Sequence, residues 1–416
     1  MPFIAQGKTN LRYILIVVIL SVIVGGGILG YYLSWIKELE AKLTKIELKL
    51  TEVSEKSRYE EEPTNLFLAG SNRESVLVII YNRDQKKITK EKIINLNGLS
   101  LDSSGCQGWG KNDSVQYNIA TGQILLSIDN ISAFDGSLSP DAPYAQAILV
   151  ASFDSDAPQV IFIPEGNILS WITHSSKPMV YIAHQIPSTS NEEILEINLL
   201  NKKVRKIADV GNISNSNHLE LIMSKDENFI FQAVRLHNPK NKVLIKKVNL
   251  ENDDILTIDL EDSSNSFDTN NLSPDEKYFA FFGGFMAETG LRIRNLEQEK
   301  TDILPLPENQ DIANSNILWS GDNKNLLFLI KTNDNRVPFI YSLEQKEGRI
   351  INSLINQHPL IWAPATNYII LKERLYNLED QKYNNLNWSI FDLENNKIED
   401  VYSSSSLWDT VGAHWF

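Results

Sequence analysis

The sequence is poor in cysteine and histidine, the residues that staple small secreted domains or bind metals in many enzymes. It contains one cysteine, Cys106, and six histidines among 416 residues. A single cysteine allows no internal disulfide, and an exported domain without disulfides is typical of many bacteria. Because Cys106 lies far from the N-terminal apolar segment, a lipid anchor on this cysteine is also excluded.

Motifs for catalysis and cofactor binding are missing as well. The chain has no G-x-S-x-G, H-E-x-x-H or C-x-x-C segment and no glycine-rich phosphate loop. The acidic stretches Asp154-Ser155-Asp156 and Asp253-Asp254 lack the spaced oxygen ligands and the glycine of a calcium loop. We therefore expect no catalytic site, no cofactor and no metal site, and we interpret these carboxylates as solvated loop residues.

Positive charge is in deficit. The chain has 39 Lys and Arg against 53 Asp and Glu, which gives a net charge of −14. Residues 1–63 contain eight of each kind, so the whole negative balance lies in residues 64–416. A domain this acidic repels nucleic acid and anionic lipid, so we expect no nucleic-acid partner. A neutral or cationic partner, or Ca²⁺ held by carboxylates, fits this charge better.

One turn recurs along residues 64–416. Its copies are Leu138-Ser139-Pro140-Asp141, Met223–Glu227 and Leu272–Tyr278, with degenerate copies at Trp319–Lys324 and Trp362–Pro364. Proline presets φ in such a turn, while serine and aspartate cap free backbone N–H groups. Each copy precedes a run rich in aromatic and branched residues, so we expect it to join the inner strand of a blade to the second strand. Self-similarity of this kind predicts an all-β fold, a β-propeller.

The copy at Ser273, Pro274 and Asp275 predicts one complete four-stranded blade. Its second strand is expected at 277–282 and its fourth strand at 301–306. The third strand, 291–296, alternates apolar and charged residues, as a half-exposed strand does.

The spacing of the turns favours a seven-bladed propeller, with an eight-bladed one as the alternative. The anchors of the turns are Trp109, Leu138, Trp171, Ile222, Leu272, Trp319, Trp362 and Trp415. The later anchors are 43 to 53 residues apart, which suits four-stranded blades, but the first two separations are only 29 and 33 residues. Either one early blade is incomplete or two anchors share a blade. We interpret the tryptophans as core between blades rather than as a carbohydrate platform.

The two ends of the propeller are expected to complete one blade together. Residues 413–416 resemble an inner strand with nothing after it, and residues 65–69, 76–82 and 88–95 resemble outer strands with no inner strand before them. Such closure leaves no long free edge for another chain to pair with.

The turn motif resembles that of the TolB-like, WD40-like (PD40) propeller family. A typical blade of this family carries W-S-P-D-G-K-x-I-A-F, and residues 273–282 are the closest match, with Glu276 where the family usually has glycine. Trp319-Ser320-Gly321-Asp322 keeps the tryptophan and the aspartate but replaces the proline. The resemblance covers roughly residues 64–416 and implies the fold, but not an activity.

An apolar run of 21 residues without charge, residues 13–33, is long enough to cross a membrane as a helix. Lys8 and Arg12 precede it, so the positive-inside rule places residues 1–12 in the cytoplasm and the propeller outside the cell membrane. The alternative is a cleaved signal peptide, which the length of the run and the lack of an Ala-x-Ala site disfavour.

Residues 34–63 are predicted to form a helical stalk and a parallel coiled coil. The apolar seam repeats at spacings of three and four and consists of Ile36, Leu39, Leu43, Ile46, Leu50 and Val53. Gly26 and Gly30 form a G-x-x-x-G face that lets two membrane helices approach closely. Together they predict a parallel homo-oligomer. The alternative is a single amphipathic helix.

These observations favour a membrane-anchored binding or scaffolding module whose propeller presents a face to a protein or envelope ligand. An envelope-assembly or sensory subunit is the second possibility. An enzyme, a lyase or hydrolase with its site at the central channel, is the third. The sequence itself contains no catalytic motif that supports the third.

Overall fold

The structure is a computed structural model in which the chain separates into two compact units, Met1–Glu62 and Pro63–Phe416. It describes residues 63–72, 75–96, 100–101, 115–129, 146–155, 157–186, 191–212, 216–224, 226–236, 242–259, 270–283, 290–304, 311–312, 317–332, 335–354, 357–363, 366–377, 382–404 and 409–416. The predicted span 13–33 with Gly26 and Gly30, and the stalk seam from Ile36 to Val53, lie outside these residues. Within the described residues, no helix has the length and apolar character needed to cross a membrane.

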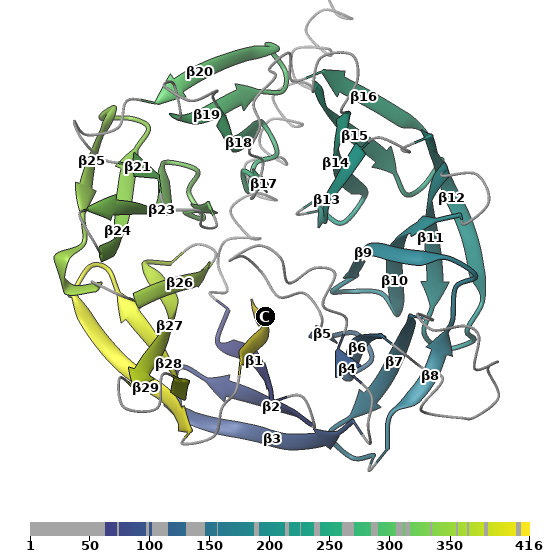
Figure 1. Cartoon of the computed structure of the whole chain (residues 1–416), viewed down its shortest axis with the longest axis horizontal. Coiled ribbons are helices and arrows are strands. Elements are labelled where there is room, and N and C mark those ends of the chain that lie inside the picture. The colour runs from purple at the N-terminus through teal and green to yellow at the C-terminus, as the bar shows by residue number, and fades with distance from the viewer. Residues whose placement is uncertain are drawn as a thin grey trace, which may run out of the picture. The chain divides into compact units, whose positions relative to one another are not determined.

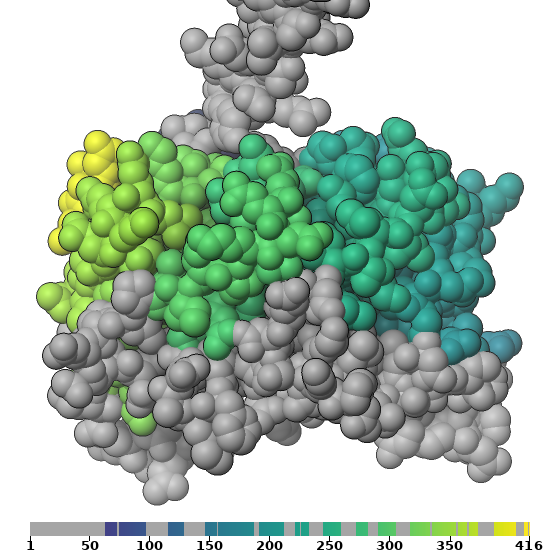
Figure 2. All heavy atoms as spheres, turned by 90° about the horizontal axis from the view of Figure 1, so that it is seen from above, coloured from purple at the N-terminus to yellow at the C-terminus, as the bar shows by residue number. Residues whose placement is uncertain are grey.

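The described strands form seven antiparallel sheets that follow one another around a ring (Figure 1). Neighbouring sheets come from consecutive parts of the chain, as the change from teal through green to yellow along the side of the molecule shows (Figure 2). The fold is therefore a seven-bladed β-propeller, which confirms the favoured blade number and excludes the eight-bladed alternative.

Each blade begins with an inner strand near the axis and ends with an outer strand. Blade 1 consists of β30 (Asp409–Trp415), β1 (Asn65–Ser71), β2 (Ser75–Asn82) and β3 (Lys87–Asn95). Blade 2 consists of β4 (Ser100–Leu101), β5 (Val115–Asn118), β6 (Gln123–Asp129), β7 (Ala147–Ser152) and β8 (Gln159–Phe162). Blade 3 consists of β9 (Asn167–Thr173), β10 (Met179–Gln185), β11 (Asn191–Asn198) and β12 (Val204–Asn212).

The remaining blades repeat this order. Blade 4 consists of β13 (Ser216–Met223), β14 (Phe229–Leu236), β15 (Lys242–Asn249) and β16 (Ile255–Asp259). Blade 5 consists of β17 (Asn270–Leu272), β18 (Tyr278–Gly283), β19 (Gly290–Asn295) and β20 (Lys300–Leu304). Blade 6 consists of β21 (Asp311–Ile312), β22 (Leu318–Trp319), β23 (Asn325–Thr332), β24 (Asn335–Ser342) and β25 (Glu347–Ile350), followed by the 3₁₀ turn η2 (Asn352–Leu354). Blade 7 consists of β26 (Gln357–Trp362), β27 (Tyr368–Asn377), β28 (Lys382–Asp392) and β29 (Lys397–Ser404).

Blade 1 joins the two ends of the propeller, as predicted. β30 pairs with β1 in antiparallel register, and Phe416 exchanges two backbone hydrogen bonds with Asn65, at 2.9 and 3.1 Å. Gly412 lies so close to blade 2 that a Cβ at this position would overlap the Val115 carbonyl oxygen. The last strand therefore closes its own blade and also packs tightly against the next one.

Blade 2 explains the short early spacing of the turns. β5 and β6 are its inner and second strands and β7 is its third, so the anchors Trp109 and Leu138 fall within one blade. Ser139, Pro140 and Asp141 lie between β6 and β7, outside the described residues. The expectation that this copy joins an inner strand to a second strand is wrong, because the topology places it between the second strand and the third.

The core lies between the blades, in apolar clusters that each draw on two neighbouring sheets. In β1, Leu66 and Leu68 pack toward blade 7, while Phe67 and Ala69 pack toward blade 2. Strands in the middle of a blade are thus covered on both faces, and they read as continuous apolar runs rather than as alternating patterns.

This arrangement also corrects the expectation for the third strand of blade 5. Arg292 and Arg294 in β19 are 7% and 3% exposed, because blade 4 covers the face on which they lie. Burial lowers the pKa of Arg292. Arg294 donates a hydrogen bond to the hydroxyl of Thr301 on the outer strand, at 3.3 Å. The alternation of apolar and charged residues here marks two buried faces, not one exposed face.

Candidate functional site

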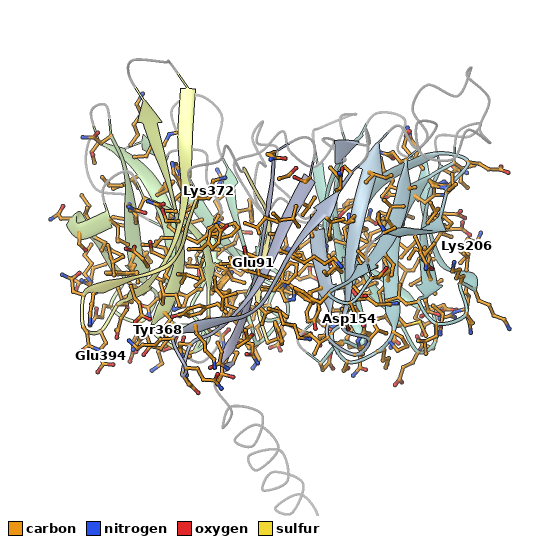
Figure 3. The ribbon with its side chains drawn as sticks, turned by 90° about the horizontal axis from the view of Figure 1, so that it is seen from below. Glu91, Asp154, Lys206, Tyr368, Lys372 and Glu394 are labelled. Carbon is orange, nitrogen blue, oxygen red and sulfur yellow. The ribbon has the colours of Figure 1, made fainter. Side chains whose placement is uncertain are left out.

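The two ends of the strands define two faces of the propeller. The connections from first to second strand and from third to fourth strand lie at one end, which we call the turn face; the other connections lie at the opposite face. Figure 3 shows Tyr368, Glu394 and Asp154 along the edge that belongs to the turn face, and Lys372 on β27 farther toward the opposite one. The described residues supply most of the turn face, so its chemistry can be derived residue by residue.

The recurrent serine and aspartate build the turn that starts each second strand. In blade 5 the Ser273 hydroxyl accepts a hydrogen bond from the Tyr278 N–H at 2.9 Å and donates to Asp275 Oδ1 at 2.6 Å. The turns at Ser224 and Ser320 repeat this pair of bonds. All three serines are at most 4% exposed. The predicted turn residues Ser273, Pro274 and Asp275 therefore have a structural role.

The residue after this aspartate has left-handed backbone geometry in three blades. Its φ is 58° at Glu227, 61° at Glu276 and 61° at Asn323. Glycine adopts this region freely, whereas other residues are strained there, which explains the glycine that is usual here in the propeller family that this motif resembles. In this chain the side chains at these positions reach back to the preceding blade: Asn323 Oδ1 accepts the Asp275 N–H at 3.0 Å, and Glu276 lies 4.0 Å from the Lys247 ammonium.

Glu227 makes the most extensive of these contacts, with the turn of blade 3. Its carboxylate accepts hydrogen bonds from the Ser175 N–H at 2.6 Å and from the Ser176 hydroxyl at 2.6 Å, and it lies 2.9 Å from His174 Nδ1. Burial by itself would raise the pKa of Glu227, but the hydrogen bonds from His174, Ser175 and Ser176 outweigh it and hold this pKa at about 2. The ionised carboxylate therefore clamps blade 3 to blade 4.

A serine, a histidine and a carboxylate meet here, so we tested this cluster as a catalytic triad. In a triad the carboxylate and the nucleophile contact different ring nitrogens, because the histidine must pass a proton between them. Here Ser176 Oγ and Glu227 both approach Nδ1 of His174, at 3.4 and 2.9 Å. The other ring nitrogen, Nε2, is buried and has no hydrogen-bond partner among the described residues. The geometry supports a structural clamp and not nucleophilic catalysis.

Polar contacts also join the other blades around the turn face. Asn118 of blade 2 donates to the hydroxyl of Thr173 at 2.9 Å and to the His174 carbonyl at 2.7 Å. Glu399 of blade 7 accepts hydrogen bonds from Tyr81 at 2.8 Å and Lys86 at 2.5 Å, both on blade 1. These bonds hold the pKa of Glu399 below its ordinary value although burial opposes them. The turn face is therefore a chain of contacts between blades.

A second polar cluster is buried between blades 3 and 4. Glu192 and Gln232 are 1% and 0% exposed, and the Gln232 amide donates a hydrogen bond to the carboxylate. The Lys246 ammonium donates to the Val210 carbonyl nearby. Burial lowers the pKa of Lys246, and the charge of Glu192 opposes this shift. The described residues contain no group of three or more potential metal ligands, so this cluster is best described as a buried carboxylate with an amide donor and a partly buried lysine nearby.

The sequence also contains a second repeated turn, between third and fourth strands, that we did not predict. Its copies begin at Asn82, Asn198, Asn249, Asn295, Ser342 and Asp392. The fifth residue of each copy has positive φ, between 49° and 63°. The second residue of the turn is usually leucine. Its N–H donates a hydrogen bond to the carbonyl of the residue that precedes the second strand of the same blade, as from Leu250 to Asn228 at 2.9 Å. The recurring Asn-Leu-Glu letters are the signal that could have revealed it.

Other residues singled out in the sequence have structural surroundings. Trp171, Trp319 and Trp362 are 5 to 6% exposed and lie in clusters between blades, as expected of core residues. Asp253 pairs with Arg205 across blades 3 and 4 at 3.0 Å. Neither the tryptophans nor this ion pair indicates a ligand-binding site.

Comparisons with known proteins agree with the fold. No family model matches the sequence, and no curated protein matches it. An oligogalacturonate lyase in complex with manganese is similar, with a TM-score of 0.53 and 9% identity over 82% of this chain and 84% of that chain. An oligogalacturonate lyase from Vibrio parahaemolyticus has a TM-score of 0.54 and 8% identity, covering 84% and 88%. TolB from Acinetobacter baumannii has a TM-score of 0.44 and 14% identity, covering 82% and 79%.

At these identities the similarity to the two lyases shows the fold alone. The β-propeller fold that the resemblance to TolB-like propellers implied is confirmed by the seven described sheets themselves. The chain is a seven-bladed β-propeller, and polar side chains on its turn face form hydrogen bonds between neighbouring blades.

Proposed function

We propose that this protein is a membrane-anchored, extracytoplasmic β-propeller that binds or scaffolds a protein or envelope ligand. The proposal combines the apolar run 13–33 with one feature of the fold, the place at which the chain reaches the propeller. Thr64 lies just before β1. Its carbonyl accepts a hydrogen bond at 2.8 Å from the N–H of Arg83, which lies in the turn between the third and fourth strands of blade 1. The chain thus reaches blade 1 at the turn face.

In this proposal the two faces have different tasks. The chain joins the propeller at the turn face and leaves the opposite face free of this attachment. The polar groups of the turn face are engaged in contacts between blades, as Glu227 and Glu399 illustrate. A ligand is therefore expected at the opposite face, and the propeller is proposed to act by binding rather than by catalysis.

The test uses the full chain in a bacterial host. Protease added to intact spheroplasts should digest the propeller and spare residues 1–12, and the protein should fractionate with membranes. A photo-crosslinking amino acid at the exposed Asn335, at the opposite face, should give a discrete adduct, whereas the same group at the exposed Glu297 of the turn face serves as the matched control. Protection of the propeller from protease would refute the topology. Equal adducts from both positions would refute the assignment of the faces.

A further inference from the structure

The third-to-fourth turns provide an internal comparison in which one blade differs from all the others. Six of them share the same conformation, with positive φ at Lys86, Lys202, Asp253, Glu299, Lys346 and Asn396. The backbone conformation is therefore the same in these six turns. Where their exposed side chains differ, the difference is not needed to form the turn.

The third residue of these turns is exposed and acidic in five of the six. It is Asp84, Glu251, Glu297, Glu344 or Glu394. In blade 3 the same position is Leu200, which is 73% exposed. The turn of blade 3 thus presents an apolar side chain where its five counterparts present a charge.

The charges that follow Leu200 also differ from those of blades 4 to 7, whose turns have at most one lysine at the two corresponding positions. The fifth and sixth residues of this turn are Lys202 and Lys203, whereas blade 4 has Asp253 and Asp254 at these positions. Among the described residues, no carboxylate lies within ion-pair distance of Lys202 or Lys203, and the Lys202 ammonium contacts only the Val160 carbonyl, at 3.4 Å. The turn is thus apolar and cationic within an acidic domain.

Blade 1 is the nearest comparison in charge, because its turn ends in Lys86 and Lys87. That turn keeps Asp84 at the third position, and Lys86 is paired with Glu399 at 2.5 Å. Blade 3 therefore differs from blade 1 in having an exposed leucine beside two lysines that form no ion pair with any described carboxylate.

We propose that the blade 3 turn, Leu200 to Lys203, docks on the membrane surface, with Leu200 inserted among the lipids and the two lysines at headgroup phosphates. This inference rests on the proposed membrane anchor. Apolar tips flanked by lysine are suited to the lipid interface, and one leucine is too small to form the core of a protein interface. The chain reaches blade 1 on this same face, at Thr64.

The acidity of the neighbouring turns limits the contact to this one blade. The counterparts in blades 4 to 7 carry glutamate at the third position, and an acidic surface is repelled by anionic lipid. A propeller docked in this way would tilt toward blade 3 and hold its opposite face in a defined orientation.

The test places an environment-sensitive fluorophore on Leu200→Cys in the full chain, with Cys106→Ser as background, in vesicles of phosphatidylethanolamine and phosphatidylglycerol. The matched control is Glu251→Cys, at the same position of the same turn in blade 4. The fluorophore at position 200 should be blue-shifted, quenched by a lipid-borne spin label and several-fold less accessible to aqueous iodide than at position 251. Lys202→Glu with Lys203→Glu should reduce this difference; glutamate is compatible with the backbone at position 202, because Glu299 occupies the equivalent left-handed site.

The outcomes separate this inference from the proposed function. A chain that does not float with the vesicles overturns the membrane anchor and the docking together. A chain that floats while positions 200 and 251 are equally accessible to iodide overturns the docking alone. Protection of position 200 in detergent as well as in vesicles, without quenching by lipid, would replace the membrane by a second copy or another protein.

Discussion

The clamp between blades 3 and 4 depends on the charge of Glu227, and replacing this residue with glutamine tests it directly. Glutamine keeps the size and one acceptor oxygen, but it removes the negative charge that the Ser175 N–H and the Ser176 hydroxyl contact at 2.6 Å. Because the side chain of Glu227 is only 15% exposed, solvent screens these bonds weakly. The variant should fold and lose stability.

The magnitude follows from the pKa of the carboxyl. A drop from the ordinary 4.5 to about 2 in the folded state corresponds to roughly 3 kcal/mol, at about 1.4 kcal/mol for each tenfold change. This is an upper bound, because the amide of Glu227→Gln still accepts a hydrogen bond. A loss of about 1 to 3 kcal/mol is therefore expected near neutral pH, the range measured for hydrogen bonds to charged groups.

The sign of the pH dependence is fixed by the direction of the shift. A carboxyl whose pKa is lowered on folding stabilises the protein above its unfolded pKa, and this contribution disappears as the pH falls through the folded pKa. The stabilisation by Glu227 should therefore be complete above about pH 5 and should fall to about half or less at pH 3. The difference between wild type and Glu227→Gln should shrink in the same range.

The assay is urea unfolding of both proteins at pH 7 and pH 3, followed by tryptophan fluorescence. Glu251→Gln is the matched control, because Glu251 lies exposed in a turn of the same blade. Equal unfolding midpoints for Glu227→Gln and Glu251→Gln at pH 7 would show that the clamp has no energetic role. A gap between wild type and Glu227→Gln that is unchanged at pH 3 would refute the assignment to an ionised carboxylate.

Three further changes test other parts of the structure. Deletion of residues 413–416 should lower the thermal midpoint far more than the loss of four terminal residues normally does, because it removes three of the seven residues of β30 and both hydrogen bonds between Phe416 and Asn65. Similar midpoints for the two chains would contradict the stabilising role of this closure. Gly412→Ala should destabilise the propeller by about 1 to 3 kcal/mol through overlap with the Val115 carbonyl, and an unchanged midpoint would mean that the two blades separate easily. Glu299→Gly should raise stability by about 0.5 to 1 kcal/mol by relieving strain at a φ of 54°, whereas Glu297→Gly in the same turn should not; equal effects would argue against strain.

The sequence by itself was sufficient for the features that depend on local chemistry. The turn at Ser273, Pro274 and Asp275 is formed by contacts within six residues. Such a motif can therefore be recognised in the sequence wherever these residue types are retained. The closing blade was also predictable, since strands without partners at both ends of a repeat array must pair with each other. The spacing of the turns favoured seven blades over eight, and the seven described sheets decided between them.

Only the tertiary structure decided the features that depend on how blades pack. Glu227 and Ser175 are 52 residues apart and meet because consecutive blades lie side by side. Arg292 and Arg294 looked half-exposed in sequence but are buried, because a sheet in a propeller is covered on both faces. Leu200 was not distinguished in the sequence from the other leucines; its exposure appeared only when the turn placed it at the tip. Turn chemistry acts over a few residues, whereas burial and charge pairing are set by neighbours about one blade away along the chain.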